Sequence, residues 1–146
     1  MDYSLAGYAS VPVLSESAVQ SLLGIPEVDA PYEHVVFAPI NIEPQSARRN
    51  YFLMIIETQI DCVDEERSDF IKFDSKDPVR PDLSGSYQSF FNLVVDPKKI
   101  GDSHIFRVMG YIGAIVVSEE VRDRFERAGV VGAIFESVNG DRVTVA

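Results

Sequence analysis

The densest group of chemically capable side chains is an acidic run near the middle of the chain. Five carboxylates fall within nine residues: Asp61, Asp64, Glu65, Glu66 and Asp69. Such a group can collect a hard cation such as Mg²⁺, or it can present a negative field to a basic surface. Crowded carboxylates are more often simply solvated, and the neighbouring Arg67 offers them a surface partner. We therefore predict no metal site and no cofactor.

The other reactive residue types give little support to catalysis. His34 and His104 each stand in an apolar, strand-like run, which favours structural histidines over general bases. Cys62 lies among acidic residues that raise the pKa of a thiol, contrary to what a reactive thiolate needs. Ser118 is explained by helix capping, because the Gly-x-Ser-x-Gly pattern is absent. We predict no catalytic residues.

The clearest local structure signals lie between residues 115 and 136. A β-branched run at 115–117 is followed by Ser118, whose hydroxyl suits a helix N-cap. Gly129 is expected to end the helix in a left-handed conformation. The helix face expected to point inward carries Val121, Phe125 and Ala128.

The N-terminal part of the chain repeats this succession. A strand-like run at 11–14 leads to Ser15, and Gly24 then precedes a second strand-like run at 34–40. Ser15 would correspond to Ser118 and Gly24 to Gly129, so we predict a degenerate repeat. At the C-terminal end, Asn139-Gly140 between two strand-like runs predicts a two-residue hairpin turn.

Further strand-like runs occupy the middle of the chain, and a loop rich in Pro, Asp, Gly and Ser spans 74–86. These runs are 51–57, 70–73, 90–95 and 105–109. We predict an α+β fold in which a mixed or antiparallel sheet carries two strand-helix-strand units and a C-terminal hairpin. No linker divides the chain, so residues 1–146 are expected to form a single domain.

Composition indicates an ordinary globular protein, with 46% hydrophobic and 25% charged residues. No apolar run approaches the roughly 20 residues that cross a bilayer, so we predict no membrane span. The N-terminus lacks the basic region and apolar core of a secretory signal, which makes the cytoplasm the expected location. Cys62 is the only cysteine, which excludes an internal disulfide.

The net charge of −10 is distributed unevenly. Residues 1–77 hold 14 acidic against 5 basic side chains, whereas residues 78–146 hold 9 against 8. A field of this sign repels nucleic acid and anionic lipid, so we predict neither as a partner. It attracts basic protein surfaces and accelerates their encounter.

Several segments together resemble a family of bacterial immunity proteins that accompany polymorphic toxins, a family named from a myxobacterial example. The segments are Asp61-Cys62-Val63-Asp64-Glu65-Glu66-Arg67-Ser68, His104-Ile105-Phe106-Arg107-Val108, Val116-Val117-Ser118-Glu119-Glu120 and Ala128-Gly129-Val130-Val131-Gly132-Ala133-Ile134-Phe135. The resemblance spans roughly residues 51–138. It implies that the protein neutralises a cognate toxin by binding it, which needs no catalytic residue.

A toxin that attacks nucleic acid must present a basic groove, and an acidic surface can fill such a groove as a phosphate mimic. We therefore expect a basic, nuclease-like toxin domain as the partner. The expected partner-binding residues are Asp61, Asp64, Glu65, Glu66 and Asp69, with Asp74 and Asp77 as rim charges.

Two other classes of function stay open at this point. A small metal-dependent enzyme would use the acidic run as its cation site. An adaptor or oligomerisation module would use aromatic anchors such as Tyr87, Phe90 and Phe91, and a weak homodimer belongs to this alternative. Phe90 and Phe91 are adjacent in a strand-like run, so they are expected to point to opposite faces.

Overall fold

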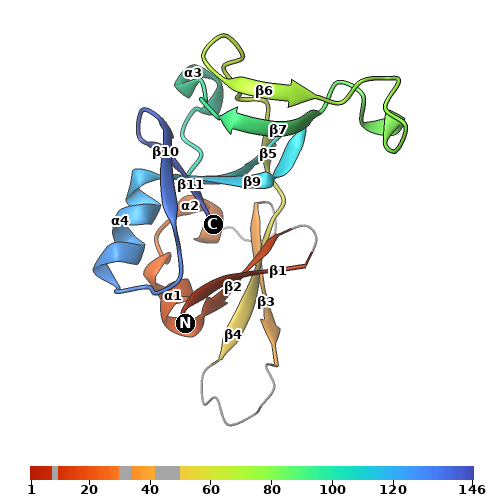
Figure 1. The fold of residues 1–146 in the computed structure, drawn as a ribbon. Helices are drawn as coiled ribbons and strands as arrows, with labels where there is room; N and C mark the ends of the chain where they lie inside the picture. Colours follow the sequence, from red (N-terminus) through yellow and green to blue (C-terminus); the bar gives the residue numbers. More distant parts are fainter. Residues whose placement is uncertain (8–9, 30–33, 42–49) are drawn as a thin grey trace.

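The structure is a computed structural model that describes residues 1–7, 10–29, 34–41 and 50–146. The fold is α+β, as predicted (Figure 1). In chain order the elements are β1 (Tyr3–Ala6), β2 (Val11–Ser15), α1 (Glu16–Ser21), α2 (Pro26–Asp29), β3 (Val35–Ile40), β4 (Tyr51–Ile56), β5 (Gln59–Ile60), β6 (Asp69–Lys72), η1 (Pro81–Leu83), β7 (Tyr87–Asn92), α3 (Pro97–Ile100), β8 (Ile105–Val108), β9 (Tyr111–Ser118), α4 (Glu119–Arg127), β10 (Phe135–Asn139) and β11 (Arg142–Val145). Among the described residues, no helix has the length and apolar character that crossing a bilayer requires.

The strands form two larger sheets and one separate hairpin. The first sheet is antiparallel with the order β1-β2-β4-β3, and the second has the order β10-β11-β9-β8-β5. Strand β5 pairs with β8 in parallel, which makes the second sheet mixed. Within the part of the chain that the structure describes, strands β6 and β7 pair only with each other.

The two larger sheets contain the same ββαββ unit. In chain order, the first unit is β1-β2-α1-α2-β3-β4 and the second is β8-β9-α4-β10-β11, so the four-residue α2 is an addition to the first unit. In both units the last strand inserts between the second and third, giving the spatial orders β1-β2-β4-β3 and β8-β9-β11-β10. The predicted repeat is therefore present. Each unit has two strands before the helix and two after it, where the sequence pattern indicated one of each.

The equivalence of the units extends to single hydrogen bonds around the capping serines. Ser15 Oγ accepts from Ala18 N at 3.3 Å, and Ser118 Oγ accepts from Val121 N at 3.4 Å. The Ser15 amide donates to the carbonyl of Asp2 at 2.8 Å, as the Ser118 amide does to that of His104 at 2.9 Å. Asp2 and His104 thus occupy equivalent positions, directly before the first strand of each unit.

Each unit also supplies a hydrogen-bond acceptor for the amides at the start of the other unit. Oε2 of Glu27, which follows α1, accepts from the amides of His104 and Ile105 at 2.6 and 2.8 Å. The carbonyl of Val131, which follows α4, accepts from the equivalent amides of Asp2 and Tyr3 at 2.9 and 3.0 Å. Strand β1 is an edge strand, and β5 pairs with β8 only at Arg107 and Val108, so neither pair of amides has a strand partner on this side among the described residues. Each unit therefore depends on the other for these hydrogen bonds.

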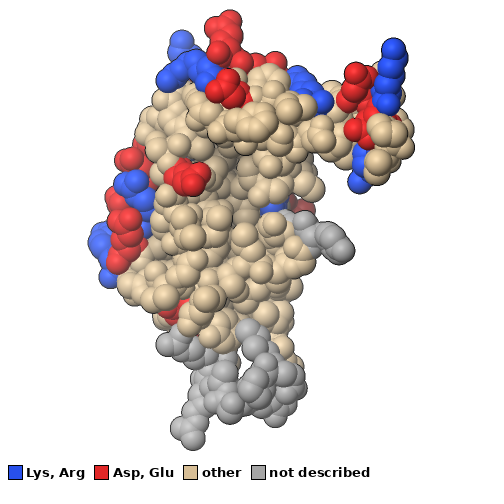
Figure 2. All heavy atoms as spheres, in the orientation of Figure 1, with Lys and Arg blue, Asp and Glu red and all other residues tan. Residues whose placement is uncertain are grey.

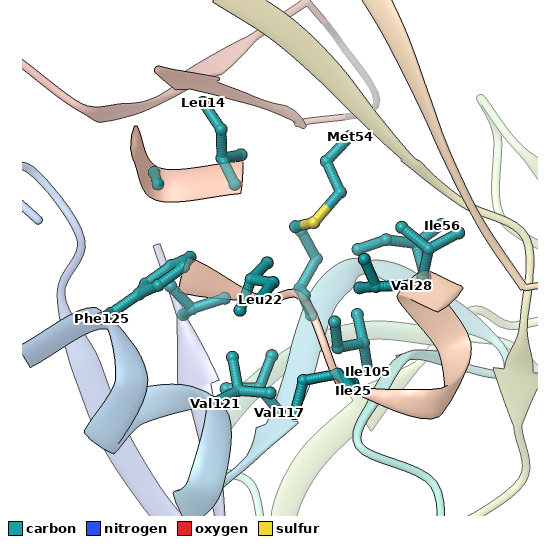
Figure 3. Packing of buried hydrophobic residues seen from close by; sticks show 14 of the residues in the cluster. Leu14, Leu22, Ile25, Val28, Met54, Ile56, Ile105, Val117, Val121 and Phe125 are labelled. Carbon is teal, nitrogen blue, oxygen red and sulfur yellow. The ribbon is translucent and has the colours of Figure 1, made fainter. Parts of the chain in front are cut away.

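The main core lies where the two units meet (Figure 3). Equivalent positions face each other there: Leu14 and Leu22 come from the first unit, and Val117 and Phe125 from the second. All four side chains are buried. Burying a side chain of this size contributes roughly 1.5–3 kcal/mol, so this shared core stabilises both units at once.

The segment 57–104 connects the two units and, apart from His104, has no counterpart in the repeat. It carries β5, the β6–β7 hairpin and α3, and it covers the face of the second sheet opposite the main core (Figure 1). A second apolar cluster forms there, in which Cys62 and Val95 of the segment pack with Phe106 and Val116 of the sheet. Part of the second sheet is therefore covered on both faces.

The structure differs from the sequence predictions in two places and confirms a third prediction, the glycine at the end of α4. Ala128 is the C-cap of α4 and is exposed, so the prediction that it faces inward is wrong; the chain turns at Gly129, and Val130 packs against the main core instead. The hairpin turn lies at Gly140-Asp141 rather than Asn139-Gly140, because a bulge between Ser137 and Asn139 shifts the register and pairs Asn139 with Arg142. Gly129 does end α4, with φ of 69°.

Candidate functional site

The acidic run is held in place by strand-like contacts on both sides of Cys62. Val63 forms an antiparallel bridge with Val95. The amide of Asp64 donates to the carbonyl of Val94 at 2.8 Å, and that of Asp96 donates to the carbonyl of Cys62 at 2.7 Å. Because Cys62, Val63 and Val95 are buried, the carboxylates beside them are presented from a fixed backbone.

Four carboxylates of the run surround a hollow of about 470 Å³. The side chains that line it on the acidic side are those of Asp61, Asp64, Glu65 and Glu66, joined by Asp96. Lys99, from α3, lines the same hollow and partly offsets their charge. The sequence predictions did not include Asp96 or Lys99, although Asp96 before Pro97 is a recognisable helix start that places both residues.

Two of these carboxylates already have internal partners. Glu65 forms an ion pair with Lys72 at 2.7 Å and accepts a hydrogen bond from the Tyr87 hydroxyl at 2.6 Å. The hydrogen bonds from Lys72 and then Tyr87 lower the pKa of the Glu65 carboxyl. Asp64 accepts from the amide of Arg67 at 3.2 Å and so braces the turn that follows.

Three carboxylates of the run form no ion pair or side-chain hydrogen bond with the described residues: Asp61, Glu66 and Asp69. All three are exposed. Asp69 begins β6, opposite Asn92 of β7. These side chains are the ones available to an external cation.

Asp74 and Asp77 lie apart from the acidic run, on the loop that precedes β7. Asp74 accepts from the amide of Lys76, and Asp77 accepts from the amides of Val79 and Arg80. The two amide hydrogen bonds lower the pKa of the Asp77 carboxyl. Figure 2 shows this loop as a projection that carries both acidic and basic side chains.

The residues considered for catalysis have structural partners. Nδ1 of His34 lies 3.1 Å from the Thr58 hydroxyl, and Nδ1 of His104 lies 2.7 Å from the Ser118 hydroxyl. Ser118 is buried and caps α4, as predicted. Cys62 is fully buried, and burial, followed by the nearby Asp61 carboxylate, raises the pKa of its thiol to about 11. Within the described ranges, no three His, Cys, Asp or Glu side chains converge as a metal site would require.

Comparison with known proteins identifies the family. The model of the immunity protein family Imm11 matches residues 25–140. The chain belongs to the Imm11 immunity protein family. No curated protein and no solved structure gives a significant match. The Imm11 match includes β3 and β4 of the first unit, all of segment 57–104, and β8 to β10 of the second unit, so the acidic hollow lies on the part of the chain that the family match covers.

Proposed function

We propose that this Imm11 protein neutralises a cognate toxin by binding it in a stoichiometric complex, without turnover. Membership of an immunity family supports a protective role with a toxin as the partner. The finer proposal is that the partner is a basic, nuclease-like toxin domain and that it meets the acidic surface of segment 57–104.

The observation that carries this proposal is the position of Asp61, Glu66 and Asp69. Their carboxylates are exposed on a backbone anchored by buried residues, and they form no ion pair or side-chain hydrogen bond with the described residues. Carboxylates fixed in this way attract a basic partner over several ångströms and raise the association rate. Because the backbone that carries them is already held, no backbone segment has to be ordered when the partner arrives.

The other predicted partner-binding residues have a secondary part in this proposal. Glu65 and Asp64 shape the hollow through their internal hydrogen bonds and add to its field. Asp74 and Asp77, on the projecting loop, would contact the rim of a large partner. Lys72 pairs with Glu65 and Lys99 lines the hollow, so both reduce the negative charge that the acidic run presents.

The test combines protection with association kinetics. Cells that express the toxin domain encoded beside this gene should survive only when the protein is co-expressed. The variant Asp61→Lys/Glu66→Lys/Asp69→Lys should then lower the association rate with that domain about tenfold or more at low salt and flatten its salt dependence.

The matched control is Glu57→Lys/Asp123→Lys/Glu126→Lys. It changes three exposed carboxylates outside the acidic run and therefore gives the same net charge. Its association rate should stay within about threefold of the wild type, because it has the same net charge as the test variant but keeps the acidic run intact. Equal rates for the two triple variants would contradict the acidic-surface proposal, and a failure of the wild type to protect would contradict the proposed function itself.

A further inference from the structure

A second hollow, separate from the acidic one, lies beside the β6–β7 hairpin. It is a groove of about 330 Å³ between the end of β7 and the face of the second sheet formed by β9, β10 and β11. Its volume is at the lower end of the range of about 300–1,000 Å³ that ligand pockets occupy. A groove of this size accommodates one or two side chains of a partner protein.

The wall formed by β7 is aromatic, and its two phenylalanines behave differently. Phe90 packs inward, with ring centroids 4.7 Å from Tyr87 and 5.0 Å from Tyr111. Phe91 lines the groove and is 73% exposed. The inward contacts of Phe90 hold β7 in place, so Phe91 is held at the groove without adding to the core. Exposed aromatic side chains beside a preformed hollow are typical of binding hot spots.

The groove carries one side-chain carboxylate and no basic residue among the described residues that line it. The carboxylate is that of Glu136 on β10, which is exposed and pairs in register with Thr144 of β11. No lysine or arginine among the described residues forms an ion pair with Glu136. A carboxylate next to an exposed aromatic ring complements a side chain that has an apolar stem and a cationic head.

We propose that this groove is the anchor pocket of the toxin interface and receives an arginine or lysine side chain of the toxin. The apolar stem packs on Phe91, and the charged head pairs with Glu136. This inference rests on the proposed function, because it takes the basic toxin as its partner. It extends the interface from the acidic run to the groove at the end of β7, where Asp69 of the run pairs with Asn92.

The position of the groove in the fold agrees with this assignment. Its aromatic wall belongs to segment 57–104, which the two repeated units do not need for their shared core. The shared core fixes the sheet that forms the floor. The groove is therefore preformed, and a partner does not have to order it on binding.

Three variants test the pocket by equilibrium titration with the toxin domain encoded beside this gene. Phe91→Ala should raise Kd roughly 30-fold, the effect of a hot-spot truncation. Glu136→Gln should raise Kd about tenfold and reduce its salt dependence. Thr144→Phe places a ring on the groove floor, between Glu136 and Val116 in register, and should raise Kd about tenfold or more by filling the space.

The matched controls are Ile71→Ala, on the same hairpin and 47% exposed, and Glu126→Gln on α4. Both should bind within about twofold of the wild type, and all variants should keep the wild-type circular dichroism spectrum and unfolding temperature within a few degrees. Wild-type affinity in Phe91→Ala and Thr144→Phe would overturn the pocket. A loss in Phe91→Ala with full affinity in Glu136→Gln would overturn the cationic occupant. If the wild type does not bind the toxin domain, the proposed function fails and the anchor pocket fails with it.

Discussion

Asp2 and His104 do the same work in the two halves of the chain: each forms a hydrogen bond with the serine that caps the following helix. The Ser15 hydroxyl donates to Asp2 Oδ1 at 2.9 Å, and Nδ1 of His104 lies 2.7 Å from the Ser118 hydroxyl. A carboxylate serves in one unit and an imidazole in the other. His104 is thus explained as a brace for a helix cap, the role that its equivalent performs without any imidazole.

The two capping serines should contribute similarly to stability. We expect Ser15→Ala and Ser118→Ala each to lower the free energy of unfolding by about 1 kcal/mol, because each change leaves an amide of the first helical turn without its acceptor. Urea denaturation at neutral pH measures the effect. Ser84→Ala, at an exposed position outside both units, serves as the control and should change stability by less than about 0.5 kcal/mol.

Gly132 should not tolerate a side chain. Its φ is +111°, and a Cβ there would lie 2.2 Å from the carbonyl oxygen of Tyr3, where the segment after α4 meets β1. We expect Gly132→Ala to lower the free energy of unfolding by about 2 kcal/mol. Gly113→Ala is the matched control, because a Cβ at Gly113 meets nothing within 4 Å. Equal stability of the two alanine variants would contradict the close contact with Tyr3.

The ion pair of Glu65 should make stability depend on pH in the acidic range. Its pKa lies below the ordinary value of 4.5 in the folded protein, mainly because Lys72 and Tyr87 donate hydrogen bonds to it. The stabilisation is therefore complete above about pH 4.5 and is lost as the pH falls through the lowered value. The stability difference between the wild type and Glu65→Gln should shrink from pH 6 to pH 2 in urea denaturation. Glu66→Gln, which removes the neighbouring exposed carboxylate, provides the baseline.

Cys62 should be inert toward thiol reagents while the protein is folded. The thiol is fully buried and its pKa is raised to about 11, so at pH 8 it is both protonated and inaccessible. We expect a chromogenic disulfide reagent to label it only as fast as the protein unfolds, and at once in denaturant. A second cysteine placed at exposed Ser84 should react immediately in the folded state. Rapid labelling of Cys62 in the native wild type would contradict the buried position.

Local sequence signals predict much of the fold. Ser118 before a helical pattern, and Gly129 at its end, identified α4 because capping depends on residues close in sequence. The repeat was visible for the same reason. Strand β1 and the two-residue β5 were not predicted, since short edge strands are defined by their pairing partners rather than by their own composition.

The site was harder to predict than the fold. The acidic run was evident in the sequence, but the sequence did not separate Glu65, which pairs with Lys72, from Glu66, which forms no described side-chain contact. The groove at Phe91 and Glu136 is formed by residues 45 positions apart, and no local pattern links them. The adjacent aromatic residues did indicate that Phe90 and Phe91 have different surroundings, and the structure confirms this.

The hydrogen-bond acceptors that Glu27 and Val131 supply, each to the other unit, have a consequence for a cleaved chain. A single proteolytic cut in the exposed loop near Ser84 would leave one repeated unit on each fragment, and each fragment would still hold the hydrogen-bond acceptor that the other lacks. We expect the nicked protein to remain assembled on a sizing column, and the two pieces, expressed separately, to reconstitute one particle. Neither piece alone should fold, because half of the shared core and the closing acceptor would be missing from each.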